Sequence, residues 1–166
     1  MSCPIMKCCQ LKEVIALKRV AVLIIVGLLG ALAGCVTGSV NTTVTPNVDL
    51  KKYQTAYVEM LKQDEFNLGT AIMAHMSGMG FLVKQAPLPA EVADTDLLVR
   101  YDYYDGWDMR KYMKNFSVNI FDAKTNALVI NSRYALTGIW RGEEFRVNYT
   151  FNDIRIKTGY PPLEDF

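Results

Sequence analysis

Short segments rich in β-branched and aromatic residues recur after residue 50, a composition typical of β-strands. The clearest of them covers residues 96–104, where alternate residues from Leu97 to Tyr103 share one face. We predict strands at residues 53–60, 81–83, 96–104, 116–120 and 128–136.

Two further segments have the spacing of helices. Between residues 64 and 80, apolar side chains recur at a broken helical period, with Asp64 as the predicted N-cap and Gly78 and Gly80 at the end. Residues 145–158 fit both the alternation of a strand and one face of a helix. Acidic residues before this segment, and a glycine and two prolines after it, favour the helix, which we predict.

The order of these elements predicts the fold class. The dipeptide Asp105-Gly106 predicts a turn, and residues 87–93 and 122–126 predict loops. We expect an α+β fold, a two-layer sandwich in which helices cover one face of a mixed, mostly antiparallel sheet of about five strands. Residues 49–166 then form a single domain, because about 120 residues suffice for one core and are too few for two.

The first 34 residues have the three parts of an export signal. Four basic residues precede an apolar run at 20–33, and small residues follow before Cys35. The tetrapeptide Leu32-Ala33-Gly34-Cys35 resembles the lipobox of bacterial lipoproteins. The resemblance implies that residues 1–34 are a signal peptide and that Cys35 carries lipid. A membrane anchor or a plain secretory signal is the alternative, although a spanning helix needs about 20 apolar residues.

Residues 35–48 are predicted to be a lipidated N-terminal tether. The stretch 36–47 is rich in Thr, Ser, Val and Asn, which favours an extended chain of up to about 40 Å. In the Gram-negative lipoproteins that this segment resembles, Asp after the lipidated cysteine tends to retain the protein on the inner membrane. Val36 stands there instead, so the resemblance implies an outer-membrane lipoprotein that faces the periplasm.

Composition argues against several classes of function. Four of the 18 Lys and Arg residues and one of the 17 acids precede Cys35, which leaves a formal charge of −2 on the rest. No basic block stands out, so nucleic acid is not an expected partner. The other three cysteines lie in the predicted signal peptide, so thiol catalysis, disulfides and thiolate metal sites are not expected.

Four short motifs together resemble those of small bacterial envelope lipoproteins of unknown function. They are residues 53–58, Gly78-Met79-Gly80-Phe81, residues 96–101 and Gly159-Tyr160-Pro161-Pro162. The resemblance covers about residues 50–163 and implies fold and location, with no catalytic residue. Lipoproteins of similar small α+β folds serve as accessory subunits of secretion or cell-wall machines, which is the kind of role that the resemblance implies.

The stretch 101–112 is the densest in aromatic and charged residues. Tyr and Trp offer rigid contact area, while Asp and Arg offer directional hydrogen bonds. We predict a partner-binding surface from this stretch and from the pair after the last predicted strand. Its candidates are Tyr104, Asp105, Trp107, Asp108, Tyr112, Trp140 and Arg141. The plainer interpretation is that the tyrosines fill the core, that Trp107 packs over a loop and that Trp140 caps the edge of the sheet.

No catalytic or metal-binding set is predicted, and no cofactor is expected beyond the lipid on Cys35. The aspartates of 101–112 lack the spacing of an EF-hand loop. Acids such as Asp105 and Asp108 suit a glycosidase only at a defined separation, which a sequence does not supply. His75 is the only histidine and is expected to be a packed side chain.

These observations favour a non-enzymatic outer-membrane lipoprotein that binds a protein partner or scaffolds an envelope complex. A glycan- or peptidoglycan-binding module, or a glycan-active one, is an alternative, because flat aromatic rings beside carboxylates stack on sugars. A self-assembling ring subunit of an export machine is a further alternative.

Overall fold

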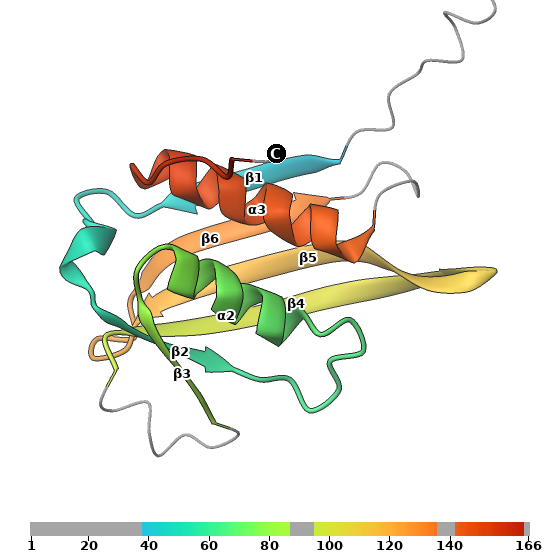
Figure 1. The fold of residues 1–166 in the computed structure, drawn as a ribbon, viewed down its shortest axis with the longest axis horizontal. Helices are drawn as coiled ribbons and strands as arrows, with labels where there is room; N and C mark the ends of the chain where they lie inside the picture. The colour runs from blue at the N-terminus through green and yellow to red at the C-terminus, as the bar shows by residue number, and fades with distance from the viewer. Residues whose placement is uncertain (1–37, 87–94, 136–141, 165–166) are drawn as a thin grey trace, which may run out of the picture. The chain divides into compact units, whose positions relative to one another are not determined.

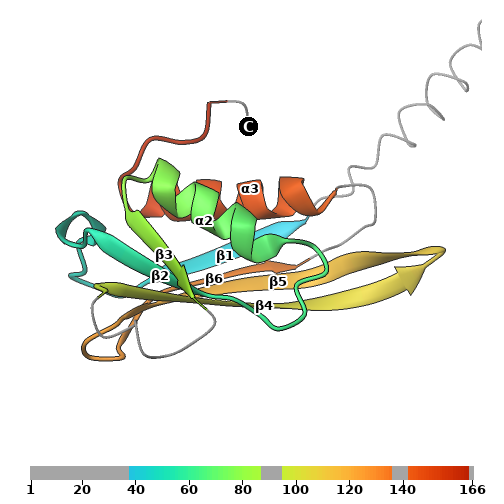
Figure 2. The same cartoon turned by 60° about the horizontal axis from the view of Figure 1, so that its bottom comes forward.

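The computed structural model describes residues 38–86, 95–135 and 142–164, which form one α+β unit. Two helices cover one face of a six-stranded sheet, and Figure 2 shows both helices above it (Figures 1 and 2). The predicted fold class is therefore confirmed. No helix within the described ranges is long and apolar enough to cross a membrane.

The sheet is mixed, with the order β1-β6-β5-β4-β2-β3. Strand β2 runs parallel to β3 and β4, and the other neighbouring strands are antiparallel. There are six strands in the described residues instead of about five, because the predicted tether supplies one. The strands are β1 (Ser39–Val44), β2 (Thr55–Glu59), β3 (Leu82–Ala86), β4 (Leu97–Asp108), β5 (Arg110–Asp122) and β6 (Leu128–Ala135).

The tether prediction is wrong for Ser39–Val44, which forms the edge strand β1 against β6. The apolar alternation of β1 is weak in the sequence because Thr42 takes a position that faces the core. The buried Thr42 hydroxyl shares a 2.6 Å hydrogen bond with the Ser132 hydroxyl. The Nζ of Lys157 donates to the carbonyl oxygen of Thr42 at 2.7 Å. The folded unit thus begins before residue 49.

Helix α2 (Leu68–Gly78) connects β2 to β3, as their parallel pairing requires. Asp64 is not the N-cap residue, because that position belongs to Asn67, whose φ is 53°. The Asp64 carboxylate nevertheless accepts hydrogen bonds from the N–H groups of Leu68 and Gly69, at 2.9 and 2.7 Å. Asp64 therefore satisfies two backbone N–H groups at the start of α2, although it lies outside the helix.

The end of α2 follows the prediction. Gly80 has a φ of 93°, and the N–H of Phe81 reaches back to the Met76 carbonyl at 3.2 Å. On the sheet beneath, Tyr101 donates to Asp64 at 2.9 Å, and burial raises the pKa of Tyr101 to about 12. These contacts fix α2 over the middle of the sheet.

The C-terminal segment, which fits both a strand and a helix in sequence, forms the predicted helix, α3 (Glu143–Lys157). Val147, Phe151 and Ile154 are buried, which is the helical face that the sequence offered. The rings of Phe145 and Tyr149, which fit a strand equally well, stack on each other at 5.8 Å. Burial against the sheet thus decides between the two periodicities.

The β4–β5 hairpin is longer than predicted and extends past the ends of both helices (Figures 1 and 2). The Asp105-Gly106 turn is wrong, because both residues lie inside β4 and the chain reverses at Met109, with a φ of 58°. Gly106 is paired with Tyr112, and a Cβ at 106 would come within 2.6 Å of that ring. The glycine therefore makes room for an aromatic ring across the strand pair.

The two faces of the sheet differ in chemistry. Residues of the helix side are mostly apolar and buried, as the alternation in β4 predicted. The side away from the helices, which we call the open face, carries three mostly polar rows across β4, β5, β6 and β1, which we call the polar rows. The rows are Arg100-Asn119-Asn131-Thr43, Asp102-Ser117-Arg133-Asn41 and Tyr104-Asn115-Ala135-Ser39.

Candidate functional site

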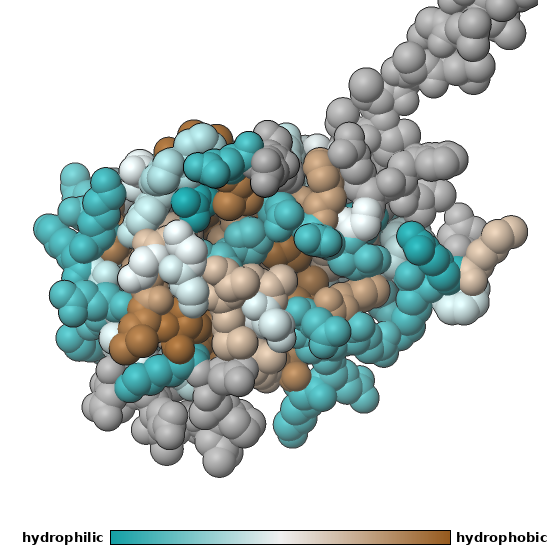
Figure 3. Space-filling model, in the orientation of Figure 1, coloured by the Kyte–Doolittle hydropathy of each residue, from teal (hydrophilic) through white to brown (hydrophobic). Residues whose placement is uncertain are grey.

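The turn of the β4–β5 hairpin presents large apolar side chains to solvent. We call residues 107–111 the hairpin tip. Trp107 is 74% exposed and Met109 is 95% exposed. On the helix side of the unit, by contrast, apolar surface gathers over α2 and β3, with hydrophilic surface around it (Figure 3). Tryptophan and methionine are enriched at protein interfaces relative to the rest of the surface, so the tip is a candidate contact surface.

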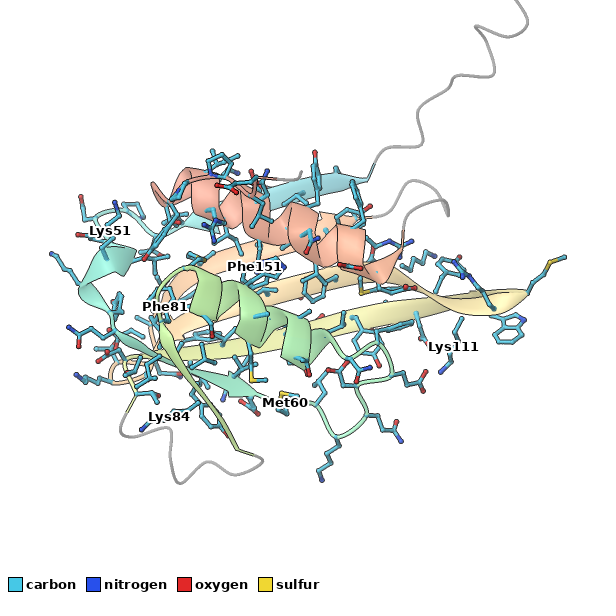
Figure 4. All side chains as sticks on the ribbon, viewed as in Figure 1. Lys51, Met60, Phe81, Lys84, Lys111 and Phe151 are labelled. Carbon is cyan, nitrogen blue, oxygen red and sulfur yellow. The ribbon has the colours of Figure 1, made fainter. Side chains whose placement is uncertain are left out.

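Lys111 connects the tip to the loop that precedes α2 (Figure 4). Its Nζ lies 2.7 and 2.9 Å from the two Glu65 carboxylate oxygens, and 3.2 Å from Oδ2 of Asp105. Hydrogen bonds to Glu65 and then to Asp105 raise the pKa of Lys111. Because all three groups are half-exposed, the pairs orient the tip more than they stabilise the fold.

A groove of about 650 Å³ lies between this loop and the hairpin. Tyr103 lines it, and its ring packs edge-on against Phe66 at 5.2 Å. The Tyr103 hydroxyl is already engaged, because it donates to the Gln63 carbonyl oxygen at 3.2 Å. The charged side chains around the groove have both signs, so it does not select a strongly charged ligand. They are Lys62, Glu65, Asp102, Asp105 and Lys111.

Tyr104 belongs to a different surface from Trp107. A β-bulge falls between Tyr104 and Asp105 and shifts the register of the hairpin there. Tyr104 is 72% exposed and lines a hollow of about 280 Å³ on the open face. The predicted patch is therefore split by the fold into two surfaces, the hairpin tip and this hollow.

The other hairpin candidates differ in how accessible they are. The Asp105 carboxylate is engaged by Lys111, and the half-buried Tyr112 ring lies against Gly106. Asp108 lies at the end of β4, and its backbone is paired with Arg110. Trp107 is therefore a largely exposed candidate side chain at the end of the hairpin.

Three predicted functional residues lie outside the described residues. They are the lipidation site Cys35 and the second candidate pair, Trp140 and Arg141. All three stay predictions from the sequence.

His75 is packed, as predicted. Its Nε2 lies 2.9 Å from Oδ1 of Asn148, and its ring stacks on Phe151 at 4.6 Å. Burial lowers the pKa of His75. Within the described ranges, no group of three or more His, Cys, Asp or Glu side chains is placed to hold a metal ion.

Two features of these surfaces were missed from the sequence. Met109 is an apolar residue between charged neighbours, and this isolation is the pattern that marks an exposed tip. The asparagines within β5 and β6 offered the second clue, because asparagine is depleted in strands. A sheet face that carries several of them has a composition that propensity alone does not explain.

No known family model matches the sequence, and no curated protein does. Solved bacterial structures share its fold. A PelC dodecamer from Paraburkholderia phytofirmans has a TM-score of 0.52 and 13% identity, covering 76% of this chain and 100% of that chain. A variant of that PelC, also a dodecamer, has a TM-score of 0.50 and 13% identity over 75% and 100%. A DUF4136 family protein from Bacteroides thetaiotaomicron has a TM-score of 0.51 and 14% identity over 74% and 96%.

Proposed function

We propose that this protein is a lipid-anchored, non-enzymatic subunit of a complex in the bacterial cell envelope, and that its hairpin tip binds another protein. The observation that carries the proposal is the exposure of Trp107 and Met109 at the end of a hairpin that extends past both helices. Aromatic and methionine side chains are enriched at protein interfaces.

The expected contribution of Trp107 to binding affinity follows from its residue type. Truncation of a tryptophan that anchors an interface typically costs about 2 kcal/mol or more, which is roughly a 30-fold loss of affinity. The ion pairs of Lys111 hold the base of the tip in one orientation. A preorganised tip loses less conformational entropy on binding, which favours affinity.

The anchor in this proposal is lipid on Cys35, supported by the lipobox-like tetrapeptide, and Val36 after it favours the outer membrane and the periplasmic side. Because β1 begins at Ser39, residues 36–38 separate it from Cys35 and span about 11 Å at most. Intact mass spectrometry of the native protein tests this part. An uncleaved chain without lipid would contradict it.

A second candidate function is that the partner is a further copy of this chain, in a ring. The shared fold with PelC structures that are dodecamers favours this candidate. Native mass spectrometry of the purified full-length protein separates the two cases. An assembly of defined copy number supports the ring, whereas a monomer leaves a different protein as the partner.

The test of the tip uses the double variant Trp107→Ser/Met109→Ser. Complexes are extracted from the envelope in mild detergent, and their sedimentation is measured. We expect the wild type to sediment in a larger complex and the double variant to sediment as free protein. Both side chains are largely exposed, so the thermal midpoint of unfolding should stay within a few degrees of the wild type.

The matched control is Leu128→Ser, which removes an exposed apolar side chain at the start of β6. This variant should sediment with the large complex. Unchanged sedimentation of the double variant would contradict the proposed role of the tip.

A further inference from the structure

The hollow on the open face has the chemistry of a ligand site separate from the hairpin tip. It measures about 280 Å³, close to the lower limit of small-ligand sites, which is about 300 Å³. Tyr104 forms an exposed aromatic wall. The polar side chains around it come from β4, β5 and β6 and are Asp102, Asn115, Ser117, Asn131 and Arg133.

These polar groups supply both donors and acceptors. The Ser117 hydroxyl donates to Asp102 at 2.6 Å, and the side-chain amide of Asn131 donates to Oδ1 of Asn119 at 2.6 Å. In the described part of the chain, the side chains of Asn115 and Arg133 have no hydrogen-bond partner. An amide offers a donor beside an acceptor, whereas Arg offers donors only and a carboxylate offers acceptors only.

The asparagines are the unusual element. A solvated sheet face is commonly polar, but strands favour Thr and other β-branched residues over Asn. Four asparagines nevertheless lie on the open face, at positions 41, 115, 119 and 131. Their presence there costs some strand propensity, which points to a use for their amide groups.

We propose that the open face binds a glycan chain that carries acetamido and hydroxyl groups. The amides of Asn115 and Asn131 pair with the acetamido groups, which present the same donor and acceptor. The Tyr104 ring packs against the apolar face of a sugar. The polar rows continue across four strands, about 14 Å at the usual strand spacing, so a chain fits this surface better than a single ring.

The test measures binding by isothermal titration calorimetry on the full-length protein in detergent. The probe is chitohexaose, a chain of N-acetylglucosamine, and cellohexaose is the same kind of chain without acetamido groups. We expect binding of chitohexaose and at least about tenfold weaker binding of cellohexaose. Glycan strands from purified peptidoglycan form a further arm, which separates a cell-wall source from another acetamido polysaccharide.

The variant Asn115→Thr/Asn131→Thr removes both amides and introduces a better strand former. We expect its affinity for chitohexaose to fall at least about tenfold. Its thermal midpoint should stay within a few degrees of the wild type, because the better strand former offsets the lost hydrogen bond between Asn131 and Asn119. The double variant Trp107→Ser/Met109→Ser is the control, because both residues lie at the hairpin tip, outside the hollow and the polar rows, and it should bind chitohexaose as the wild type does.

Two results would overturn the inference. One is the absence of chitohexaose binding by the wild type, and the other is unchanged binding by the double asparagine variant. Neither bears on the hairpin tip, whose test uses other residues and a different readout.

Discussion

At the scale of single residues, His75 couples protonation to folding. Burial holds its pKa below the usual 6.5, and Arg155 lowers it further, while the hydrogen bond with Asn148 raises it. As the pH falls through about 6.5, the unfolded chain binds a proton that the folded protein excludes. The free energy of unfolding should therefore decrease on acidification, with the loss beginning near pH 6.5.

The variant His75→Gln isolates this effect. Glutamine keeps an N–H donor for Asn148 and does not titrate. Urea unfolding at several pH values from 5 to 7.5 should give a smaller slope for the variant than for the wild type. Asp96 and Asp122, whose pKa values are lowered by hydrogen bonds, act at lower pH and equally in both proteins. Parallel curves would show that His75 is not the coupled group.

Some single residues of the candidate site could be predicted from the sequence, and others could not. Trp107 was identified from its residue type and its charged neighbours, and the structure places it in solvent. Met109 and Lys111 were missed because their roles depend on where the chain reverses and on Glu65, which is 46 residues away. A contact over that separation leaves no local pattern in the sequence.

At the scale of elements, one buried hydroxyl pair adds to the backbone pairing that attaches β1 to β6. Removal of either partner leaves the other hydroxyl buried without its partner, at a cost of about 1–3 kcal/mol. We predict that Thr42→Val and Ser132→Ala each destabilise the protein by roughly this amount. The double variant should lose less than the sum, by about 0.5–3 kcal/mol.

Urea unfolding of the four proteins gives this coupling energy. An unchanged m-value across the set would show that the variants alter stability alone and leave the unfolded state as it was. Additive losses would mean that the two hydroxyls do not depend on each other.

Sequence patterns predicted some of the elements and missed others. Most strands and both described helices were predicted, because their buried residues follow a period of 2 or 3.6. Strand β1 was missed because Thr42 breaks the apolar alternation and because pairing with β6 supplies its stability. The turn at Asp105-Gly106 was wrong because the glycine accommodates the Tyr112 ring inside the strand pair.

At the scale of the whole molecule, the fold separates residues that are neighbours in the sequence. The predicted contact surface was one patch, but the alternation of β4 places Tyr104 on the open face with Arg100 and Asp102, and it leaves Trp107 at the tip. Residues an odd number of positions apart on a strand face opposite sides of the sheet. The proposed protein contact and the proposed glycan contact thus lie on distinct surfaces of one domain.

The proposed role of the hairpin tip requires a contact with another protein in the cell. Its most direct test is photo-crosslinking in living bacteria, with a benzophenone amino acid placed at Trp107 and, in a control strain, at Leu128. We expect a discrete adduct of higher mass from position 107 and none from position 128. Position 107 without any adduct, or the same adducts from both positions, would contradict the claim.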